Sequence, residues 1–231
     1  MPLNNSKGNM FDFVTHTWNP IKGACFYDCS YCYMKRWGEG RLKAPRLVKS
    51  ELKTDLGNNN FIFVGSSIDM FAVDIPHSWI SDVLFECNNC KNKYLLQTKN
   101  PVRYHHFLEE YYFRAEKFVL STTIESNRGY EAKKNYVPPQ DRAFWMCKLP
   151  KEYKRMLTIE PIMDFDADQF IEIINAVNPQ QINIGADTMN KNLKEPSADK
   201  LRFLIASLEC SGFKIKQKSN LKRILKGDEK K

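Results

Sequence analysis

Short apolar runs recur along the chain roughly every 25 to 35 residues, and amphipathic or charged stretches separate them. This alternation is typical of repeated strand–helix units, whose consecutive strands form a largely parallel sheet. Six or seven such strands suit an α/β fold of the partial (β/α)6-type TIM barrel kind with a mostly parallel sheet. The runs predict strands at Phe11–Val14, Phe61–Val64, Tyr94–Gln97, Phe118–Ser121, Met156–Ile159 and Ile182–Gly185, with a seventh candidate at Phe213–Ile215.

Between these runs, apolar residues at helical spacing predict the intervening helices. Asp166 and Ser197 are expected to be N-caps, because short polar side chains accept hydrogen bonds from the amides of the first turn. No repeat or Gly/Ser-rich linker divides the chain, so we expect one domain over residues 1–225 and a basic tail over 226–231. The helices are predicted at Ser78–Cys87, Pro101–Tyr112, Asp166–Val177 and Ser197–Ser211.

The composition is that of a globular protein without membrane spans. Hydrophobic residues make up 42% of the 231 positions, which is too many for a disordered chain. No uncharged run approaches the roughly 20 residues that a membrane span needs. The first residues, Met1–Lys7, lack the basic region and apolar run of a secretory signal, so a cytoplasmic location is expected.

The charge balance is basic. Lys and Arg outnumber Asp and Glu by 35 to 27, which gives a formal net charge of +8. Many of the basic residues lie after Phe213, towards the C-terminus. A polyanionic partner such as nucleic acid would account for them, and so would a solvated basic tail that aids solubility.

Three of the seven cysteines form a CxxxCxxC pattern, Cys25, Cys29 and Cys32, just after the first predicted strand. Three thiolates at this spacing can ligate three irons of a cubane, whereas ordinary electron-transfer clusters use a fourth cysteine. A zinc knot is the alternative, but zinc prefers four ligands, and the nearest histidine, His16, precedes the loop and is expected on the strand. An odd cysteine count and this crowding argue against a disulfide framework.

The loop around these cysteines, with Tyr31 immediately before the last one, resembles the signature of the radical S-adenosylmethionine superfamily. The resemblance implies a [4Fe-4S] cluster on the three cysteines, with the free iron chelated by S-adenosylmethionine. It also implies reductive cleavage of that cofactor to a 5′-deoxyadenosyl radical that abstracts hydrogen from a substrate. The electron would come from a partner such as flavodoxin or ferredoxin.

The turn after the second predicted strand, Gly65-Ser66-Ser67, stands where the superfamily has a Gly-Gly-Glu-like stretch that binds the methionine amino group. The resemblance implies cofactor binding by Gly65, Ser66 and Ser67, although serines replace the usual pattern and no glutamate is near. Asp69 is a further polar candidate. A plain strand-to-helix turn is the alternative.

Several polar residues further along the chain follow the ends of predicted strands, and the loops at these strand ends hold the chemistry in barrels of this type. Thr123 and Glu125 are candidate partners of the cofactor, and Glu160 is a candidate for ribose hydroxyls or a substrate. Ordinary salt bridges are the alternative for these residues. Lys99, Lys216 and Gln217 are the candidate substrate residues. From Thr17 to about Lys218 the order of Gln97–Pro101, Ser121–Asn127, Thr158–Ile162 and Lys216–Gln217 resembles an often phage-borne branch of the superfamily that is distantly similar to spore photoproduct lyase.

The remaining cysteines form a CxxC, Cys87 and Cys90, and two single positions, Cys147 and Cys210. Four thiolates could hold an auxiliary cluster or zinc, but Cys87 closes one predicted helix and Cys210 lies on the apolar face of another. Reduced cysteines are therefore favoured.

Three functions remain open at this point. The basic balance and the distant likeness to a DNA-repair lyase favour a radical enzyme that modifies or repairs a nucleotide or nucleic acid. The first alternative is a radical enzyme that acts on a small metabolite or peptide. The second is a non-catalytic, metal-stabilised nucleic-acid-binding protein.

Overall fold

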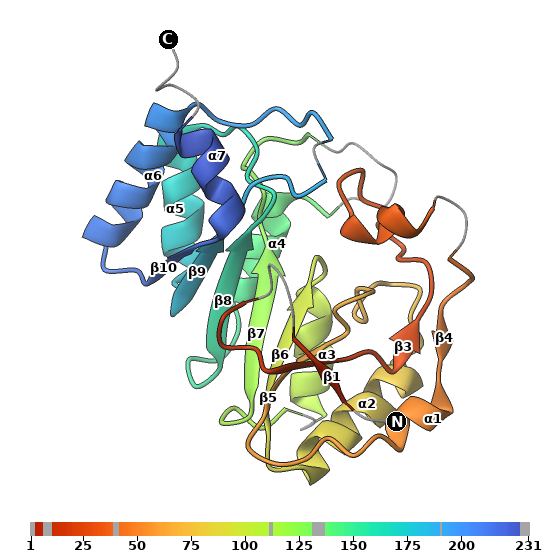
Figure 1. Ribbon diagram of the computed structural model, residues 1–231. Coiled ribbons are helices and arrows are strands. Elements are labelled where there is room, and N and C mark those ends of the chain that lie inside the picture. The colour runs from red at the N-terminus through yellow and green to blue at the C-terminus, as the bar shows by residue number, and fades with distance from the viewer. Residues whose placement is uncertain are drawn as a thin grey trace. The chain divides into compact units, whose positions relative to one another are not determined.

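The computed structural model describes residues 3–6, 11–38, 42–110, 113–130, 137–189 and 191–226, with Trp37 described by its backbone only. Within these ranges the chain has a mixed α/β fold with seven α-helices and an eight-stranded, mostly parallel sheet (Figure 1). The strand order β1-β2-β5-β6-β7-β8-β9-β10 follows the order of the chain, and β3 and β4 form a separate antiparallel pair. The described residues contain no strand pairing that closes the sheet into a barrel.

The elements have the following bounds. The strands are β1 (Asn4–Asn5), β2 (His16–Trp18), β3 (Ile21–Lys22), β4 (Arg46–Leu47), β5 (Phe61–Val64), β6 (Lys93–Thr98), β7 (Phe118–Thr123), β8 (Lys154–Ile159), β9 (Gln181–Ile184) and β10 (Ile215–Gln217). The helices are α1 (Lys49–Leu52), α2 (His77–Asn89), α3 (Val102–Glu109), α4 (Pro139–Cys147), α5 (Ala167–Val177), α6 (Ala198–Cys210) and α7 (Lys222–Leu225), with short 3-10 helices at Tyr33–Trp37 and Ser219–Leu221.

Most predicted strands are confirmed, and the first is wrong. Phe61–Val64 is β5 to the residue, and the apolar runs at Tyr94, Phe118 and Met156 lie within β6, β7 and β8. The last two predicted strands are β9 and β10, displaced by one and two residues. Phe11–Val14 instead forms a turn in which the Val14 amide donates to the Phe11 carbonyl at 3.0 Å, and β2 begins two residues later.

The four predicted helices are confirmed as α2, α3, α5 and α6, with ends that differ by up to three residues. Ser197 caps α6, since its side chain accepts from the Lys200 amide. Asp166 stands at the N-cap position of α5, but its side chain makes no capping hydrogen bond there. None of the helices in the described ranges is long and apolar enough to cross a bilayer.

The chain divides into two compact units. The first comprises described residues of Met1–Asp28, Met34–Ser121 and Leu149–Lys154, and the second those of Cys29–Tyr33, Thr122–Lys148 and Arg155–Lys231. One domain over 1–225 stays a prediction, and most of the predicted tail, 227–231, lies outside the described residues.

In the first unit, β2, β5 and β6 are parallel neighbours, and α3 lies beside β6 (Figure 1). The hydroxyl of the fully buried Tyr104 of α3 lies within donating distance of a backbone carbonyl on each of two neighbouring strands, 3.0 Å from that of Leu96 in β6 and 2.9 Å from that of Ser121 in β7. Around it Phe71, Phe107 and Phe113 pack edge to face. This aromatic cluster fixes α3 against the strands.

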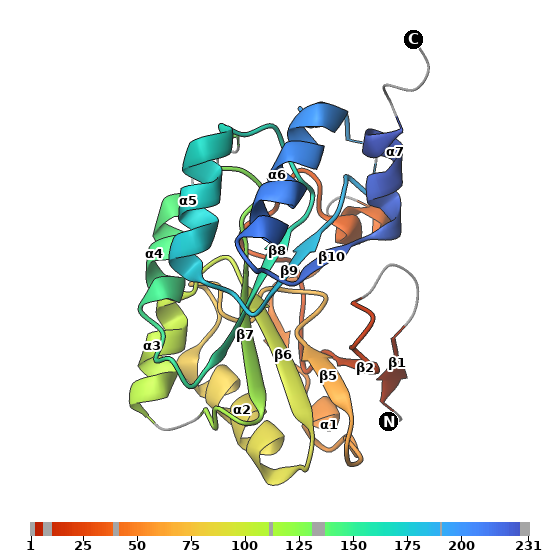
Figure 2. The ribbon, with the colours of Figure 1, turned by 90° about the vertical axis from the view of Figure 1, so that its left-hand side faces the viewer.

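In the second unit, β8, β9 and β10 are parallel and in register. Leu157, Ile159, Ile182 and Ile184 alternate with polar residues along β8 and β9 and are completely buried. Because side chains alternate between the faces of a strand, the apolar ones share one face and the polar ones the other. Figure 2 shows α5 and α6 alongside these strands, and both helices bury an apolar stripe.

Candidate active site

The cysteine loop follows the short strands β2 and β3, and all seven cysteines of the chain are thiols rather than disulfides. Its backbone forms two successive turns: the Asp28 amide donates to the Cys25 carbonyl, and the Cys32 amide donates to the Cys29 carbonyl, each at 3.1 Å. The side chains of Cys25, Cys29 and Cys32 are all partly exposed.

Three thiolates match the donor chemistry of an iron–sulfur cluster with one open iron. In the described residues, however, no three or more His, Cys, Asp or Glu side chains are grouped so that they could hold a metal ion. The three cysteines match a cluster in residue type and in sequence spacing, but among the described residues their side chains are not gathered as a ligand set, and cluster binding is a proposal taken up below.

Tyr31, the aromatic residue between Cys29 and Cys32, is fixed by a buried acidic residue. Its hydroxyl donates to Glu125 Oε1 at 2.7 Å, and Glu125 lies just beyond the end of β7. Glu125 Oε2 accepts from Arg142 Nη1 of α4 at 2.9 Å, and both side chains are almost completely buried, at 2% and 1% exposed. The same Arg142 nitrogen also donates to the Thr123 carbonyl at 2.9 Å. The last part of the cysteine loop is thus held to β7 and α4.

The protonation state of Tyr31 supports this arrangement. Burial, with the adjacent Glu125 carboxylate as the next cause, raises the pKa of Tyr31 well above its usual value. The phenol therefore stays protonated and donates to the carboxylate. Glu125, predicted as a cofactor contact, is seen here as the residue that orients the loop, and its contact with a cofactor stays a prediction.

The turn after β5 is tied to the end of β2. Gly65 has a positive φ of +75°, which favours glycine, and its amide donates to the Trp18 carbonyl at 2.9 Å. Asn19 Oδ1 accepts from the Ser67 amide at 2.9 Å and lies within hydrogen-bonding distance of both serine hydroxyls, at 3.2 Å for Ser66 and 3.0 Å for Ser67. These hydrogen bonds join the turn to the residues at the end of β2, and cofactor binding by Gly65, Ser66 and Ser67 stays a prediction.

The Asp69 carboxylate is hydrogen-bonded to the residues at the end of β6. Its carboxylate accepts from the Thr98 hydroxyl at 2.8 Å, the Lys99 amide at 2.7 Å and the Phe71 amide at 3.0 Å. Burial raises the pKa of Asp69, and the hydrogen bonds from Lys99 and Thr98 oppose that rise. The backbone of Lys99 is therefore structural, while a role of its side chain towards a substrate stays a prediction.

Glu160, directly after β8, pairs with Lys218, directly after β10. Lys218 Nζ lies 2.7 Å from Glu160 Oε2, and both side chains are mostly shielded from solvent. Between them lies Gly185 at the end of β9, where a Cβ atom would come within 2.7 Å of Glu160 Cδ. A side chain at position 185 would therefore displace the Glu160 carboxylate from its position over β9.

The predicted substrate pair Lys216 and Gln217 is divided between two faces. Lys216 lies opposite Asn183, and Gln217 lies opposite Ile184, so Lys216 shares the polar face of the second unit. The exposed Gln217 lies on the same face as the buried isoleucines, and therefore on the face opposite to Lys216 and Asn183.

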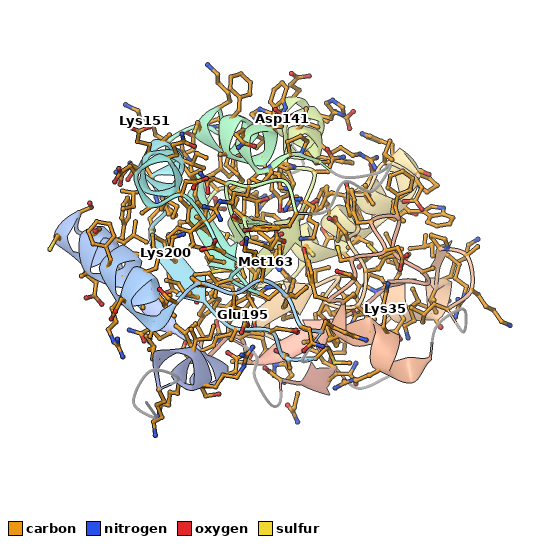
Figure 3. All side chains as sticks on the ribbon, turned by 90° about the horizontal axis from the view of Figure 1, so that it is seen from above. Lys35, Asp141, Lys151, Met163, Glu195 and Lys200 are labelled. Atoms are coloured by element: carbon orange, nitrogen blue, oxygen red, sulfur yellow. The ribbon has the colours of Figure 1, made fainter. Side chains whose placement is uncertain are left out.

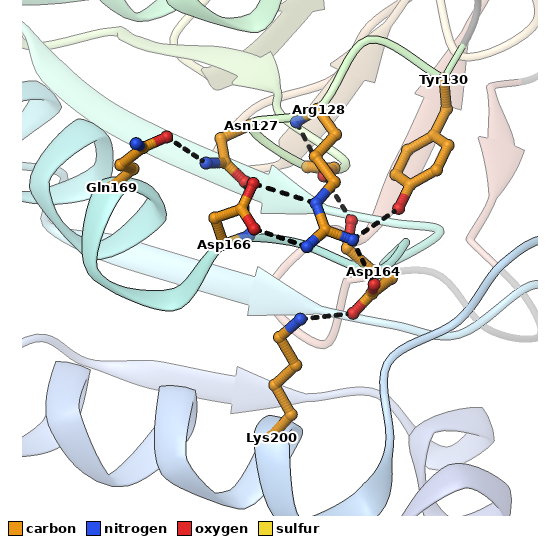
Figure 4. A network of polar contacts seen from close by, with 8 residues as sticks. Asn127, Arg128, Tyr130, Asp164, Asp166, Gln169 and Lys200 are labelled. Carbon is orange, nitrogen blue, oxygen red and sulfur yellow. Dashed lines mark hydrogen bonds and ion pairs between the residues drawn. The ribbon is translucent and has the colours of Figure 1, made fainter.

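The loops after β7 and β8 are joined to α6 by a charged network (Figure 4). Arg128 donates to both Asp164 and Asp166, and Lys200 of α6 donates to the other oxygen of Asp164 at 2.6 Å. Lys200 and the loop residue Met163, both labelled in Figure 3, belong to the second unit. The Met163 amide donates to the Glu125 carbonyl at 2.9 Å. This network rigidifies the loops that carry Glu125 and Glu160.

The other four cysteines give no sign of a second metal among the described residues. Burial raises the pKa of the Cys87 thiol, and that of Cys90 is raised as well. Cys147 Sγ lies 3.0 Å from the Ala176 carbonyl, and Cys210 is exposed at the end of α6. That these four thiols hold no second metal stays a prediction.

Sequence reasoning missed Arg142, Asn19, Asn183 and Lys218. Asn183 had a readable signal, because it is a polar residue between two isoleucines in a predicted strand. Lys218 was part of a basic segment that could have been solvated, and nothing local in the sequence pairs it with Glu160. The partners of Arg142 and Asn19 are likewise distant along the chain.

Comparisons of the chain with models of known protein families, with curated proteins and with solved structures found no match. The functional interpretation therefore depends on the residues and geometry described above.

Proposed function

We propose that this protein is a radical S-adenosylmethionine enzyme whose [4Fe-4S] cluster is held by Cys25, Cys29 and Cys32. The observation that carries the proposal is the CxxxCxxC loop, in which Tyr31 is fixed by the buried Glu125–Arg142 pair. A loop anchored by its own aromatic residue keeps the backbone around its last two cysteines in place, as a ligand loop requires. An incidental grouping of cysteines would not need such an anchor.

The sheet supports a partial (β/α)6-type TIM barrel as the architecture. Its strand order follows the chain order without the reversal that defines a doubly wound fold. The residues proposed for the site also follow strand ends: Gly65 comes after β5, Glu125 after β7 and Glu160 after β8. This is the edge where barrels of this type hold their chemistry.

When bound, the cluster and cofactor would supply the chemistry that the side chains lack, namely one-electron cleavage of S-adenosylmethionine to a 5′-deoxyadenosyl radical. The chain's own residues would bind and orient. Gly65, Ser66 and Ser67 would approach the cofactor's methionine end through a tight turn, and Thr123 is a further candidate contact of the cofactor. Glu160 would accept hydrogen bonds from hydroxyl groups.

We propose a nucleotide or nucleic acid as the substrate class. The net charge of +8 and the lysines at the end of β10 favour an anionic ligand. A small metabolite or peptide is the second candidate, because Glu160 and Lys218 could equally hold its polar groups. A flavodoxin or ferredoxin in the cytoplasm would supply the electron.

The proposal is tested by anaerobic reconstitution with iron and sulfide, followed by metal analysis and electron paramagnetic resonance of the reduced protein. We expect about four irons and four sulfides per chain and a spectrum that changes when S-adenosylmethionine is added. Cys29→Ala should lose the cluster. Cys210→Ala, which removes an exposed thiol from α6, is the matched control and should keep it.

Zinc bound in place of iron would contradict the proposal. So would a cluster whose electron paramagnetic resonance spectrum does not change when S-adenosylmethionine is added. Unfolding by a chelator together with either result would favour the third candidate, a metal-stabilised nucleic-acid-binding protein without catalysis.

A further inference from the structure

Two cysteines outside the proposed cluster loop, Cys87 and Cys90, lie together at the end of α2. Cys87 belongs to the last turn of this helix, and Cys90 is its C-cap residue with an extended backbone (φ −105°, ψ 152°). The two residues between them are helical, so helix geometry places the two Cα atoms about 5 Å apart. A disulfide requires a Cα separation of roughly 4.4–6.8 Å. The backbone therefore already holds this pair at disulfide spacing.

Lys117, the residue before β7, fixes the turn that contains the two cysteines. Its Nζ donates to the Asn88 carbonyl at 2.5 Å and to the Cys90 carbonyl at 2.7 Å, and lies 3.5 Å from the Cys87 carbonyl. These carbonyls belong to the end of α2, where a cation is favourable because the helix dipole is negative there. The same ammonium group also places a positive charge beside both thiols, which favours their thiolate forms.

The two thiols differ in their exposure to solvent. Cys90 is partly exposed, whereas Cys87 is completely buried. A reagent from solution therefore reaches Cys90 first, and Cys87 approaches Cys90 from the protein interior. This is the arrangement of an attacking thiol and a resolving thiol.

The acidities of the thiols bear on the stability of a disulfide. Burial raises the pKa of both thiols, and the charge of Lys117 opposes the rise in each case. For Cys87 the charge of Cys90 is the second cause of the raised pKa, so the two groups are close enough to interact. Dithiols that are strong oxidants in their disulfide form have a stabilised thiolate in their reduced form. Raised thiol pKa values remove that stabilisation and favour the disulfide at equilibrium.

We propose that Cys87 and Cys90 form a redox-active dithiol that a low-molecular-weight disulfide oxidises to an intramolecular disulfide. The Cys90 thiolate attacks one sulfur of the reagent, which gives a mixed disulfide and releases one thiolate. The Cys87 thiolate then attacks Cys90 Sγ and releases the second thiolate. The two cysteines lose two electrons and two protons in total, and the reagent becomes two thiols. This reaction requires neither the cluster nor S-adenosylmethionine, so the inference is independent of the proposed function.

The test incubates the folded, full-length protein with glutathione disulfide in excess over glutathione. The protein is then unfolded in urea with N-ethylmaleimide, which blocks every remaining thiol, and its tryptic peptides are analysed by mass spectrometry. One peptide, residues 54–91, contains both Cys87 and Cys90 and no other cysteine. We expect this peptide to have lost two hydrogens and to carry neither maleimide nor glutathione, and we expect dithiothreitol to restore both thiols. The exposed Cys210, on the separate peptide 203–214, is the internal control and should carry glutathione.

Two variants test the order of attack. Cys87→Ser should trap glutathione on Cys90, because the resolving thiol is absent. Cys90→Ser should leave the buried Cys87 blocked by maleimide, without glutathione. Glutathione on Cys87 in this variant would contradict the order.

A wild-type peptide 54–91 with maleimide on both cysteines, or with glutathione on Cys90 and maleimide on Cys87, would overturn the proposal. The cysteines proposed for the cluster lie on a different tryptic peptide, residues 23–35. Oxidation of the Cys87–Cys90 pair and cluster binding are therefore read separately, and failure of either leaves the other measurement intact.

Discussion

Arg142 places a guanidinium group where almost no solvent reaches it, and Glu125 places a carboxylate against it. Such a pair contributes modestly as a whole, but removal of one partner leaves an uncompensated buried charge. The Tyr31 hydroxyl adds a hydrogen bond from the cysteine loop to the same carboxylate. Stability and the position of the loop therefore depend on one acidic residue.

We expect Glu125→Ala to lower the free energy of unfolding by about 3–5 kcal/mol, because Arg142 loses its buried counter-charge. Urea denaturation followed by circular dichroism measures the change. Glu172→Ala, at an exposed position on α5, is the control and should stay within about 0.5 kcal/mol of the wild type. A Glu125→Ala variant as stable as that control would show that the pair does not hold this region.

At the residue scale, the sequence indicates which side chains could bind a metal, but it does not indicate which side chains contact one another. The cysteine spacing and the aromatic residue at Tyr31 are local patterns, and both could be read directly. The contacts Tyr31–Glu125 and Glu160–Lys218 join residues 94 and 58 positions apart, and only the fold brings them together. Glu125 was consequently predicted as a cofactor contact, while its two oxygens are seen to receive Tyr31 and Arg142.

At the element scale, the buried strands were predicted well because they are apolar throughout or alternate strictly. The exception is Phe11–Val14, in which three of the four residues are apolar; it forms a turn, with Phe11 stacked on Phe13. An apolar run predicts that a segment is buried, but a buried segment need not be a strand. Helix α4 was missed because its nine residues begin with Pro139 and include the polar Arg142 on the buried side.

The loops after β7 and β8 depend on the charges of Asp164 and Asp166 (Figure 4). Burial alone would raise the pKa of Asp164, but the hydrogen bond from Lys200 and the charges of Lys200 and Arg128 outweigh it and lower that pKa. A carboxyl group with a lowered folded-state pKa stabilises the protein above its unfolded pKa, about 3.9. That contribution is lost as the pH falls through the lower folded value.

We therefore expect Asp164→Asn to be less stable than the wild type at pH 6 to 7, with a difference that narrows as the pH falls below about 4. Urea denaturation across this range measures it. Asp199→Asn, which changes a side chain that is 90% exposed, is the control and should cost little at any pH. A constant difference for Asp164→Asn across the same range would contradict the linkage.

At the scale of the whole molecule, the repeating strand and helix pattern predicted the α/β class and the mostly parallel sheet. The strand order follows the chain, as expected for consecutive strand–helix units. The short antiparallel strands β1, β3 and β4 were not predicted, because two-residue strands carry no periodic signal. Barrel curvature depends on strand tilt and stagger, which the sequence pattern does not encode.

The measurement that tests the central claim most directly is the production of 5′-deoxyadenosine. The reconstituted, dithionite-reduced protein is incubated with S-adenosylmethionine, and the product is quantified for the wild type, Cys29→Ala and Cys210→Ala. The account predicts product from the wild type and Cys210→Ala, and none above background from Cys29→Ala. A wild-type protein that carries a verified [4Fe-4S] cluster and yields no more product than Cys29→Ala would contradict it.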